Sequence, residues 1–527
     1  MSGSRKMVFQ RLGRCRHLKI ATPEDLAHIL ELDEAHWVAT GAPIETINCD
    51  RTFLKLMDTD NNDRLMCFEV RDAIAWLMKN LRDRSGMTSG STSLLLDAIN
   101  IDQAEGGQIR ESASKILAGL DLSGADEITL EQVRRAKVTA ENRPVSETGV
   151  VLPDASEDDE LRQFITDIIA TVGGAAHPCG KSGVDRKQLG QFLSQVKVCL
   201  EQKGTEQVGE GQTESPVMPL GAEKLNKYLD ERFRNGVKSL IAGSAETASV
   251  MNDVRRVEKL ILYQAHLLRL ANNFVSFPHL YDPASRAMFE MGTLVMDGRR
   301  FNFSARVKDR PAHSEIARQG NMYVLYAEIV PIDGHKYEIA TAVTSGGKGN
   351  LFIGKRGVFE DVAGRESDAR IVEIIENPIS LNEALVSPFK RLGRALTGKI
   401  EAMTTSAEKK LDTITTQEKA PSAPSAGTNR GLLAGGLLMG GGVAVAALGS
   451  AFAYISKTLA GIEPWKIFLG IGIAILAVML PTIIVAMLKL RRRDLSAILE
   501  GAGWAINARM RLTRRQSRFF TRKPHLP

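Results

Sequence analysis

The sequence has few cysteines and lacks the short motifs that mark common enzyme classes. Five cysteines are scattered through 527 residues without a CxxC pair. An odd number of dispersed cysteines argues against a disulfide framework and against a zinc site, and it favours a reducing compartment. No HExxH or GxSxG motif is present, and no GxGxxG motif stands between a strand and a helix. We therefore expect no enzymatic activity.

The chain also lacks an apolar segment near residue 1 and a basic surface spread over its length. Residues 1–7 carry charge but no apolar core, so no secretory signal peptide is predicted. Eleven basic and two acidic residues follow Leu488, which gives this tail a charge of +9, whereas the whole chain has +6 and the remainder about −3. The basic character belongs to the tail, and we expect no nucleic-acid partner.

Charged residues are missing from two long stretches, 431–456 and 467–488. As a helix, each could cross a hydrocarbon layer of about 30 Å, so we predict a hairpin of two transmembrane helices. The positive-inside rule places the basic tail, residues 489–527, on the cytoplasmic side. Because two spans return the chain to the same side, we predict a plasma (inner) membrane protein with both termini cytoplasmic and the lipid bilayer as a partner.

Features beside these stretches predict further contacts. Gly436 and Gly440 form a GxxxG pair, which permits close helix packing. With the apolar repeat from Leu385 to Ile414, this predicts a homo-oligomer, unless the repeat packs on its own domain. Apolar residues from Leu495 to Met510 trace one helical face. That face fits an interfacial helix on an anionic lipid surface, and the alternative is a basic tail that only sets topology.

Residues 58–69 are the most informative stretch, because they have the spacing of a twelve-residue calcium loop. Ca²⁺ takes about six to eight oxygen ligands, and a bidentate carboxylate usually closes the site. The residues at positions 1, 3, 5, 7 and 12 are Asp58, Asp60, Asn62, Arg64 through its backbone carbonyl, and Glu69. We predict that Ca²⁺ binds here. The alternative is an acidic turn without a bound ion.

Apolar residues flank this loop at helical spacing, which predicts an amphipathic helix on each side. They are Phe53 and Met57 before the loop and Val70, Ala73, Ile74 and Leu77 after it. The pattern resembles the EF-hand family of calcium binders over about residues 44–80. Position 6 departs from that family, since Asp63 replaces a glycine. We expect a positive φ at Asp63, at a cost of about 1 kcal/mol.

Two further loops repeat the pattern in weaker form. Residues 121–132 have Ala125 at position 5 and Gln132 at position 12, so we predict a metal-free partner whose Ile128 pairs with Leu65. A third loop ends at Val184. Residues 175–182 within it also fit a loose phosphate-binding loop, but the preceding run is periodic as a helix, and we interpret the segment as a loop between helices.

The pattern changes to short strands near residue 276. Asp297 and Gly298 separate two strand-like runs and predict a tight hairpin. Further runs are 323–330, 336–343, 350–353, 357–361 and 369–375. Closely spaced short strands predict a small β-barrel or sandwich. A helix with Ser387 as its N-cap should follow, and a Pro/Ser-rich linker comes after it.

These segments together predict a multidomain α+β membrane protein. The predicted parts are a helical region with the calcium loop and its degenerate partner (1–145), a second helical region (146–275), the β-rich domain (276–378), an amphipathic juxtamembrane helix (379–419), a flexible linker (420–430), two transmembrane helices (431–456 and 467–488) and the basic tail (489–527). Through residues 42–69, 376–380 and 503–507, the layout resembles uncharacterised bacterial two-pass membrane proteins with an EF-hand. The resemblance implies the layout and no mechanism.

The predicted function follows from the loop and the spans. We expect a membrane-anchored cytoplasmic protein that binds Ca²⁺ and acts as a sensor or scaffold at the inner face of the membrane, with a protein partner that the sequence does not identify. The alternative is a subunit of an oligomeric pore or channel regulated by the cytoplasmic domains. The absence of ionisable residues inside the spans argues against that alternative.

Overall fold

The computed structural model of the protein describes residues 6–12, 15–204, 216–282, 284–383, 386 and 464–523. The chain divides into two compact units. The first unit consists of Met1–Leu12, Arg16–Phe289 and Trp504–Ala508, and the second consists of Gly13–Cys15, Glu290–Gly503 and Arg509–Pro527. A short segment near the end of the chain thus belongs to the unit formed by the first half.

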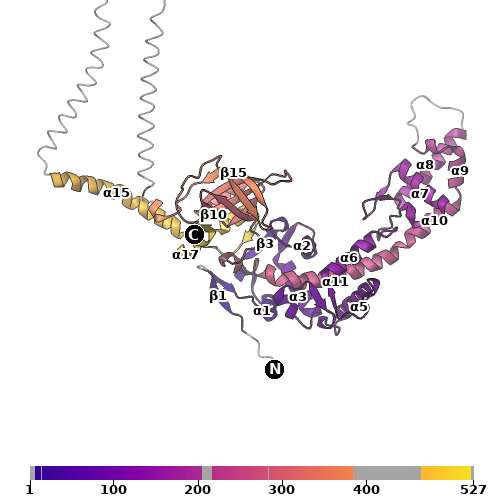
Figure 1. The fold of residues 1–527 in the computed structure, drawn as a ribbon, viewed down its shortest axis with the longest axis horizontal. Helices are drawn as coiled ribbons and strands as arrows, with labels where there is room; N and C mark the ends of the chain where they lie inside the picture. The colour runs from indigo at the N-terminus through magenta and orange to yellow at the C-terminus, as the bar shows by residue number, and fades with distance from the viewer. Residues whose placement is uncertain are drawn as a thin grey trace, which may run out of the picture. The chain divides into compact units, whose positions relative to one another are not determined.

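The first unit is largely helical (Figure 1). Its helices are α1 Pro23–Ala27, α2 Arg51–Met57, α3 Cys67–Asn80, α4 Ser85–Ser89, α5 Ala104–Gly119, α6 Leu130–Glu141, α7 Asp159–Val172, α8 Arg186–Gly204, α9 Ala222–Tyr228, α10 Glu231–Ala242 and α11 Ser244–Ala271. The short strands in this part of the chain are β1 Phe9–Leu12, β2 Cys15–Leu18, β3 Ala39–Pro43, β4 Arg64–Met66, β5 Ser93–Leu95, β6 Glu127–Thr129, β7 Ala175–Ala176 and β8 Ser182–Gly183.

Short antiparallel pairings hold three of the loops between helices. In these pairings, three pairs of apolar residues lie opposite each other: Ala42 and Leu65, Leu94 and Ile128, Val151 and Val184. The predicted pairing of Leu65 with Ile128 is therefore wrong. Each loop pairs with the extended segment before its own first helix, because closing a short stretch of chain costs less entropy than reaching a loop about sixty residues away.

Helix α11 is the central element of the first unit, and most of its apolar residues are buried. It packs against α2, α3, α4, α5 and α6, which together carry the first two helix–loop–helix segments. Tyr263 of α11 lies between the two helices that flank the first loop, with its ring centroid 5.9 Å from Phe53 and 5.4 Å from Trp76. The predicted calcium loop is thus attached to a long buried helix.

Helices α7 to α10 form a four-helix module with its own core. Each helix contributes one aromatic ring, and the rings meet with centroids 4.7 to 6.0 Å apart. These residues are Phe164, Phe192, Tyr228 and Phe233. The segment 175–182 lies between α7 and α8, which agrees with a loop between helices and not with the strand that a phosphate-binding loop requires.

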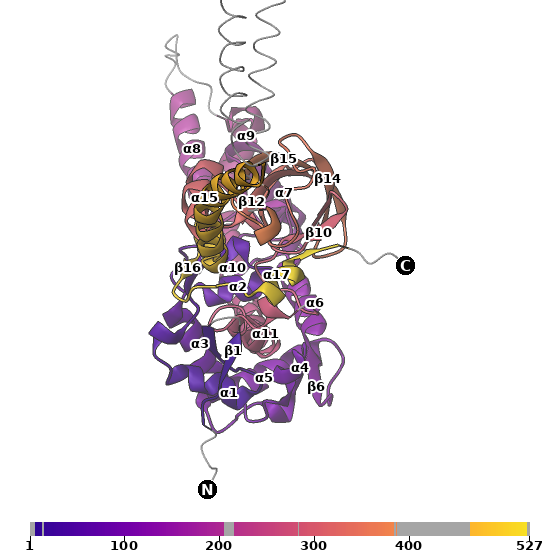
Figure 2. The same cartoon turned by 90° about the vertical axis from the view of Figure 1, so that its left-hand side faces the viewer.

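The second unit is built on one curled antiparallel sheet (Figure 2). Its strands are β9 Gly292–Met296, β10 Arg299–Phe301, β11 Ser304–Val307, β12 Tyr323–Val330, β13 Tyr337–Val343, β14 Arg356–Asp361, β15 Glu366–Ile375 and β17 Thr521–Arg522. They lie in the order β11-β13-β12-β15-β14-β9-β10-β17. The predicted barrel or sandwich is wrong: in the described part of the chain the strands form a single half-barrel, curved by the twist of its long strands.

Most of the predicted strands are present. The Asp297-Gly298 hairpin is confirmed, with φ of 56° and 64° at its two turn residues, as a type I′ turn requires. Residues 350–353 are not a strand. The helices of this unit are α12 Arg310–Ala317, α15 Pro464–Arg491, α16 Ser496–Gly501 and α17 Arg514–Phe520.

The tail after α15 folds into the two units. Helix α16 ends at Gly501, so the continuous amphipathic helix from Leu495 to Met510 is not formed. Instead β16, Ala505–Ile506, pairs with β3 in the first unit, while β17 pairs with β10 in the second. Four of the apolar residues expected on a lipid surface are buried in the protein: Leu495, Ile498, Leu499 and Met510.

In the described residues, no helix is both long and apolar enough to cross a membrane. The prediction of a two-span plasma membrane protein with cytoplasmic termini is therefore contradicted, as is the transmembrane hairpin of the predicted fold class. The second predicted span falls within α15, which contains Pro481. An uncharged run is a condition for a span and does not alone make one.

Three predicted segments cannot be compared with the fold. The first span at 431–456 and the linker at 420–430 lie outside the described residues. So does most of the predicted helix at 379–419, including its N-cap Ser387.

Candidate metal centre

The loop 58–69 connects α2 to α3. Asp50 caps α2, since its Oδ1 accepts hydrogen bonds from the N–H groups of Thr52 at 2.8 Å and Phe53 at 3.1 Å. The apolar residues predicted to flank the loop are all buried: Phe53, Met57, Val70, Ala73, Ile74 and Leu77. The two predicted amphipathic helices are therefore confirmed, and their packing fixes both ends of the loop.

Three carboxylates converge in this loop. Asp58, Asp60 and Glu69 each place one carboxylate oxygen within 4.8 Å of the other two. Asp58 and Glu69 are buried, whereas Asp60 is exposed. No other group of three His, Cys, Asp or Glu side chains in the described part of the chain has such geometry. Positions 1, 3 and 12 of the predicted site are thus brought together.

Asp58 is held by the turn that follows it. Its two carboxylate oxygens accept hydrogen bonds from the N–H groups of Asn62 and Asp63, each at 3.0 Å. This turn needs left-handed backbone, and φ is 55° at Asn61 and 57° at Asp63. The expected positive φ at Asp63 is confirmed. Aspartate and asparagine tolerate this conformation better than most residues because their short polar side chains bond locally.

Glu69 closes the loop across its full length. Its Oε1 accepts a hydrogen bond from the N–H of Thr59 at 2.7 Å, and its Oε2 accepts one from the N–H of Met66 at 2.9 Å. The side chain is almost fully buried, so these charge-assisted bonds act with little competition from water. Both oxygens of the carboxylate are therefore directed into the loop, as a bidentate ligand at position 12 must be.

Asn62 and Arg64 occupy positions 5 and 7. The Asn62 Nδ2 donates to Asp60 Oδ2 at 2.9 Å, and its Oδ1 accepts from the Arg64 N–H at 2.8 Å. Asn62 thus lies against the carboxylate cluster. Arg64 begins strand β4, and its N–H bond to Asn62 is a contact within the loop that the structure describes.

The donor set fits a hard cation. Every candidate ligand is an oxygen, which suits Ca²⁺ or Mg²⁺ and not a thiophilic metal. Cys67 lies within the loop, at position 10, but its Sγ donates to the Thr40 carbonyl at 3.5 Å. Burial, followed by the charge of Glu34, raises the pKa of this thiol to about 12. Cys67 therefore stays protonated and does not compete as a ligand.

The loop at 121–132 has the same outline without the ligands. Gln132 accepts a hydrogen bond from the Thr129 N–H at 2.8 Å, as Glu69 does from Met66. The contact across the loop is missing, because the Leu122 N–H bonds to the Leu117 carbonyl. An amide at position 12 supplies one neutral oxygen and cannot replace a bidentate carboxylate.

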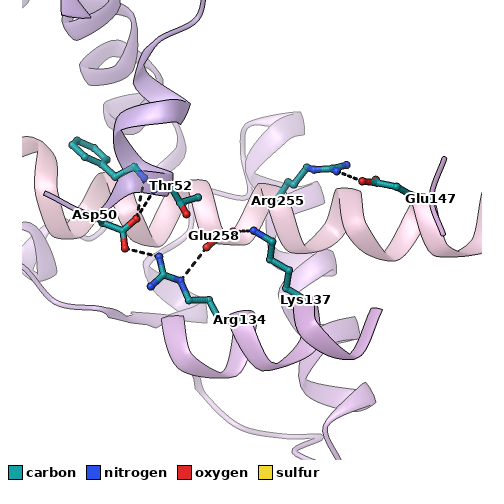
Figure 3. Close-up of polar contacts among 8 residues, drawn as sticks. Asp50, Thr52, Arg134, Lys137, Glu147, Arg255 and Glu258 are labelled. Carbon is teal, nitrogen blue, oxygen red and sulfur yellow. Dashed lines mark hydrogen bonds and ion pairs between the residues drawn. The ribbon is translucent and has the colours of Figure 1, made fainter. Parts of the chain in front are cut away.

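Side chains from distant helices support the loop, and sequence spacing gave no sign of them. Figure 3 shows Arg134 of α6 between Asp50 and Glu258. Its guanidinium lies 2.5 Å from Asp50 Oδ2 and 3.1 Å from Glu258 Oε1 of α11, and Lys137 lies 3.5 Å from the other Glu258 oxygen. The start of α2 is thus tied by charge to the second helix–loop–helix segment and to α11.

The end of α2 is tied to α11 as well. The hydroxyl of Tyr263 donates to the Leu56 carbonyl at 2.9 Å, in the last turn of α2. Burial and then the negative charge of Glu69 raise the pKa of Tyr263, so the phenol stays protonated and keeps donating. Both ends of α2 are therefore connected to α11, the start through Arg134 and the end through Tyr263.

Comparison of the chain with models of protein families, with curated proteins and with solved structures gave no match. The geometry of the loop and of its supports is therefore the basis for a functional proposal.

Proposed function

We propose that the chain is a calcium-binding protein and that the loop 58–69 is its ion site. The observation that carries the proposal is the convergence of Asp58, Asp60 and Glu69 within 4.8 Å, between two helices whose ends are fixed by packing. Asn62 and the Arg64 carbonyl complete an all-oxygen set at the spacing that Ca²⁺ prefers. An acidic turn without an ion would not need a buried position 12 carboxylate that spans the loop.

The expected affinity is modest. Asp63 holds a left-handed conformation that glycine adopts at lower cost, and Met66 at position 9 cannot orient a ligating water. Three carboxylates give the site enough charge to prefer a divalent cation. We expect a Kd between about 10 µM and 1 mM, in the range of weaker sensor and extracellular sites.

A sensor or scaffold role follows from the attachment of the loop to α11. Bidentate binding of Ca²⁺ by Glu69 draws its oxygens away from the N–H groups of Thr59 and Met66. Since Glu69 lies in the first turn of α3, the position of this helix depends on the ion. Trp76 of α3 contacts Tyr263 of α11, so a shift of α3 reaches the long helix directly.

Isothermal titration of the full chain with CaCl₂ tests the ion site. We expect one Ca²⁺ per chain and a loss of affinity of at least about tenfold in Glu69→Gln, which keeps the size and removes the charge. Asp121→Asn, at position 1 of the second loop, is the matched control and should leave binding unchanged.

Two results contradict the proposal. One is the absence of calcium heat in a folded wild-type chain. The other is equal binding by the wild type and Glu69→Gln, which would place the ion elsewhere.

A further inference from the structure

A groove of about 840 Å³ lies in the four-helix module, away from the loop 58–69. One wall is a face of α8 and the other is a face of α10, with the end of α9 between them. Its lining residues are Arg186, Leu189, Gly190, Leu193, Ser194, Lys197, Leu229, Glu231, Arg234 and Lys238. On α8 they recur at intervals of three and four residues, so they form one continuous stripe of about 16 Å.

The groove is basic at its rim and apolar at its floor. Arg186 and Lys197 stand at the two ends of the α8 stripe, and Arg234 and Lys238 face them from α10. Glu231 is the one acidic lining residue. Leucines supply the apolar surface between the cations, and one of them, Leu229, is 41% exposed. An exposed leucine beside four cations is surface that water solvates poorly and that an amphipathic partner can cover.

Arg186, Lys197, Arg234 and Lys238 differ from their neighbours in their ion pairing with the described residues. Elsewhere on this module, Lys224 pairs with Asp167 at 2.6 Å, Lys227 with Glu160 at 2.7 Å and Arg232 with Asp158 at 2.6 Å. None of the cations that line the groove forms an ion pair with a described residue. Outside the basic tail the chain is slightly acidic, so this concentration of positive charge is local. It favours an anionic ligand.

We propose that this groove binds an acidic amphipathic helix of a protein partner. A helix laid along the α8 stripe places apolar residues on Leu193 and Leu229. Its carboxylates then meet the cations at both ends and on both walls. Charge pairs at the rim add selectivity and speed of association, while the leucine floor supplies burial.

The shape and the chemistry of the groove argue against other anions. A single phosphate or headgroup that contacts the cation at one end of the α8 stripe leaves the cation at the other end, about 16 Å along the helix, without a partner. Single-stranded nucleic acid is bound by aromatic rings on which bases stack, and no aromatic residue lines this groove. The spaced cations and apolar floor fit a peptide better than either.

Fluorescence anisotropy with the full chain tests the proposal. The probe is a labelled peptide of about 20 residues that forms a helix with leucines on one face and glutamates flanking them. A second peptide has every glutamate replaced by glutamine, and a labelled single-stranded oligouridylate is the third probe. We expect saturable binding of the acidic peptide only, weakened by added salt.

Two variants test whether the peptide binds in the groove. The double variant Arg234→Glu, Lys238→Glu should reduce affinity about tenfold or more, because it reverses one wall. Gly190→Trp should block the groove without changing its charge, since the space above the Gly190 Cα is open. Lys187→Glu is the control, because it alters the charge of α8 outside the groove. All four residues are exposed, so folding is expected to persist and is checked by circular dichroism.

Each result decides the matter. Binding that Gly190→Trp leaves intact, or that Lys187→Glu weakens as much as the double variant, shows nonspecific charge attraction and overturns the proposal. So does binding of oligouridylate in the groove or the absence of peptide binding. The calcium site is independent of this groove, since Glu69→Gln leaves the groove unchanged, and either proposal can fail without the other.

Discussion

His313 is a buried histidine whose surroundings disfavour its charged form. It is 1% exposed, its Nδ1 lies 2.8 Å from the Tyr326 hydroxyl, and the Gly501 backbone packs against its ring. Burial lowers its pKa from 6.5 to about 4. A group of this kind is neutral in the folded unit and charged in the unfolded chain over the intervening pH range.

The stability of the second unit should therefore depend on pH. Because the folded pKa lies below the unfolded one, the unfolded state binds more protons between pH 6.5 and 4. The contribution of His313 is complete above about pH 6.5 and is lost as the pH falls toward 4, by about 3 kcal/mol. Urea unfolding at several pH values should show a smaller loss over this window in His313→Asn. Parallel curves for the two proteins would contradict the assignment.

The chemistry of single residues explains why the acidic loop 58–69 was visible in the sequence. The candidate ligands lie within twelve residues, so spacing alone predicts that they converge, and the left-handed backbone at Asp63 follows from the turn that this spacing requires. Tyr263 and Arg134 were not predictable. They reach the loop from helices far along the chain, and neither residue type is unusual on a helix.

At the scale of elements, α2 is held at both ends by side chains of other helices, Arg134 at its start and Tyr263 at its end. Asp50 caps its start and also accepts from Arg134, while Glu258 accepts from Arg134 and Lys137 (Figure 3). Burial raises the pKa of Asp50, but hydrogen bonds from Arg134 and the α2 backbone outweigh it, and the net pKa is lowered. The Asp50 carboxylate therefore stays ionised to a lower pH than an ordinary aspartate does, and it continues to cap α2 there.

Arg134→Met should destabilise the first unit by about 1–2 kcal/mol. The figure is smaller than for a fully buried pair because the Arg134 side chain is 41% exposed, but Glu258 is left buried with a weaker partner. Urea unfolding measures the change. A double-mutant cycle with Glu258→Gln should show coupling between the two positions.

The control for this experiment is an ion pair within a single helix, which does not connect one helix to another. Lys115 and Glu111 lie one turn apart on the exposed face of α5. Lys115→Met should leave the unfolding midpoint unchanged within error. Equal effects of Arg134→Met and Lys115→Met would mean that the Arg134 network stabilises the first unit no more than a surface ion pair does.

Local patterns also explain which elements could be predicted. The Asp297-Gly298 hairpin follows from two adjacent residues, and amphipathic helices follow from periodicity. Strand pairing does not follow from local patterns. The partner of Leu65 was misassigned because loop similarity suggested Ile128, whereas chain entropy favours the nearby Ala42. The β-rich domain was recognised, but its single half-barrel sheet was not, since sheet order depends on contacts between distant strands.

At the scale of the whole molecule, the end of the chain is used in both units. Residues 505–506 add a strand to β3, and residues 521–522 add one to β10. The sequence suggested a basic tail on a membrane surface because apolar residues at helical spacing beside arginines fit that pattern. The same apolar residues serve equally well in a protein core. Local composition cannot distinguish these uses, and the comparison with the fold corrected the prediction.

Trp504 shows what this arrangement contributes to the first unit. Its side chain is 4% exposed, its ring centroid lies 5.4 Å from Phe289 and 6.1 Å from Phe277, and its Nε1 donates to Thr46 Oγ1 at 2.8 Å. The indole fills a space among aromatic rings contributed by residues more than two hundred positions earlier. Removing it leaves a cavity in a core that the first half of the chain cannot complete alone, while the Thr46 hydroxyl keeps its hydrogen bond to the Pro43 carbonyl.

Trp504→Ala should therefore destabilise the first unit by about 3–5 kcal/mol, because it combines lost burial with the cavity term. Thr46→Val keeps the indole but removes the hydrogen bonds of the Thr46 hydroxyl with Trp504 Nε1 and with the Pro43 carbonyl, and it should cost about 1–2 kcal/mol. Trp465→Ala, at an exposed position on α15, is the matched control and should have little effect. Urea unfolding followed by far-ultraviolet circular dichroism measures all three. Similar midpoints for Trp504→Ala and Trp465→Ala would mean that the returning segment is dispensable and that residues up to Phe289 hold the first unit together.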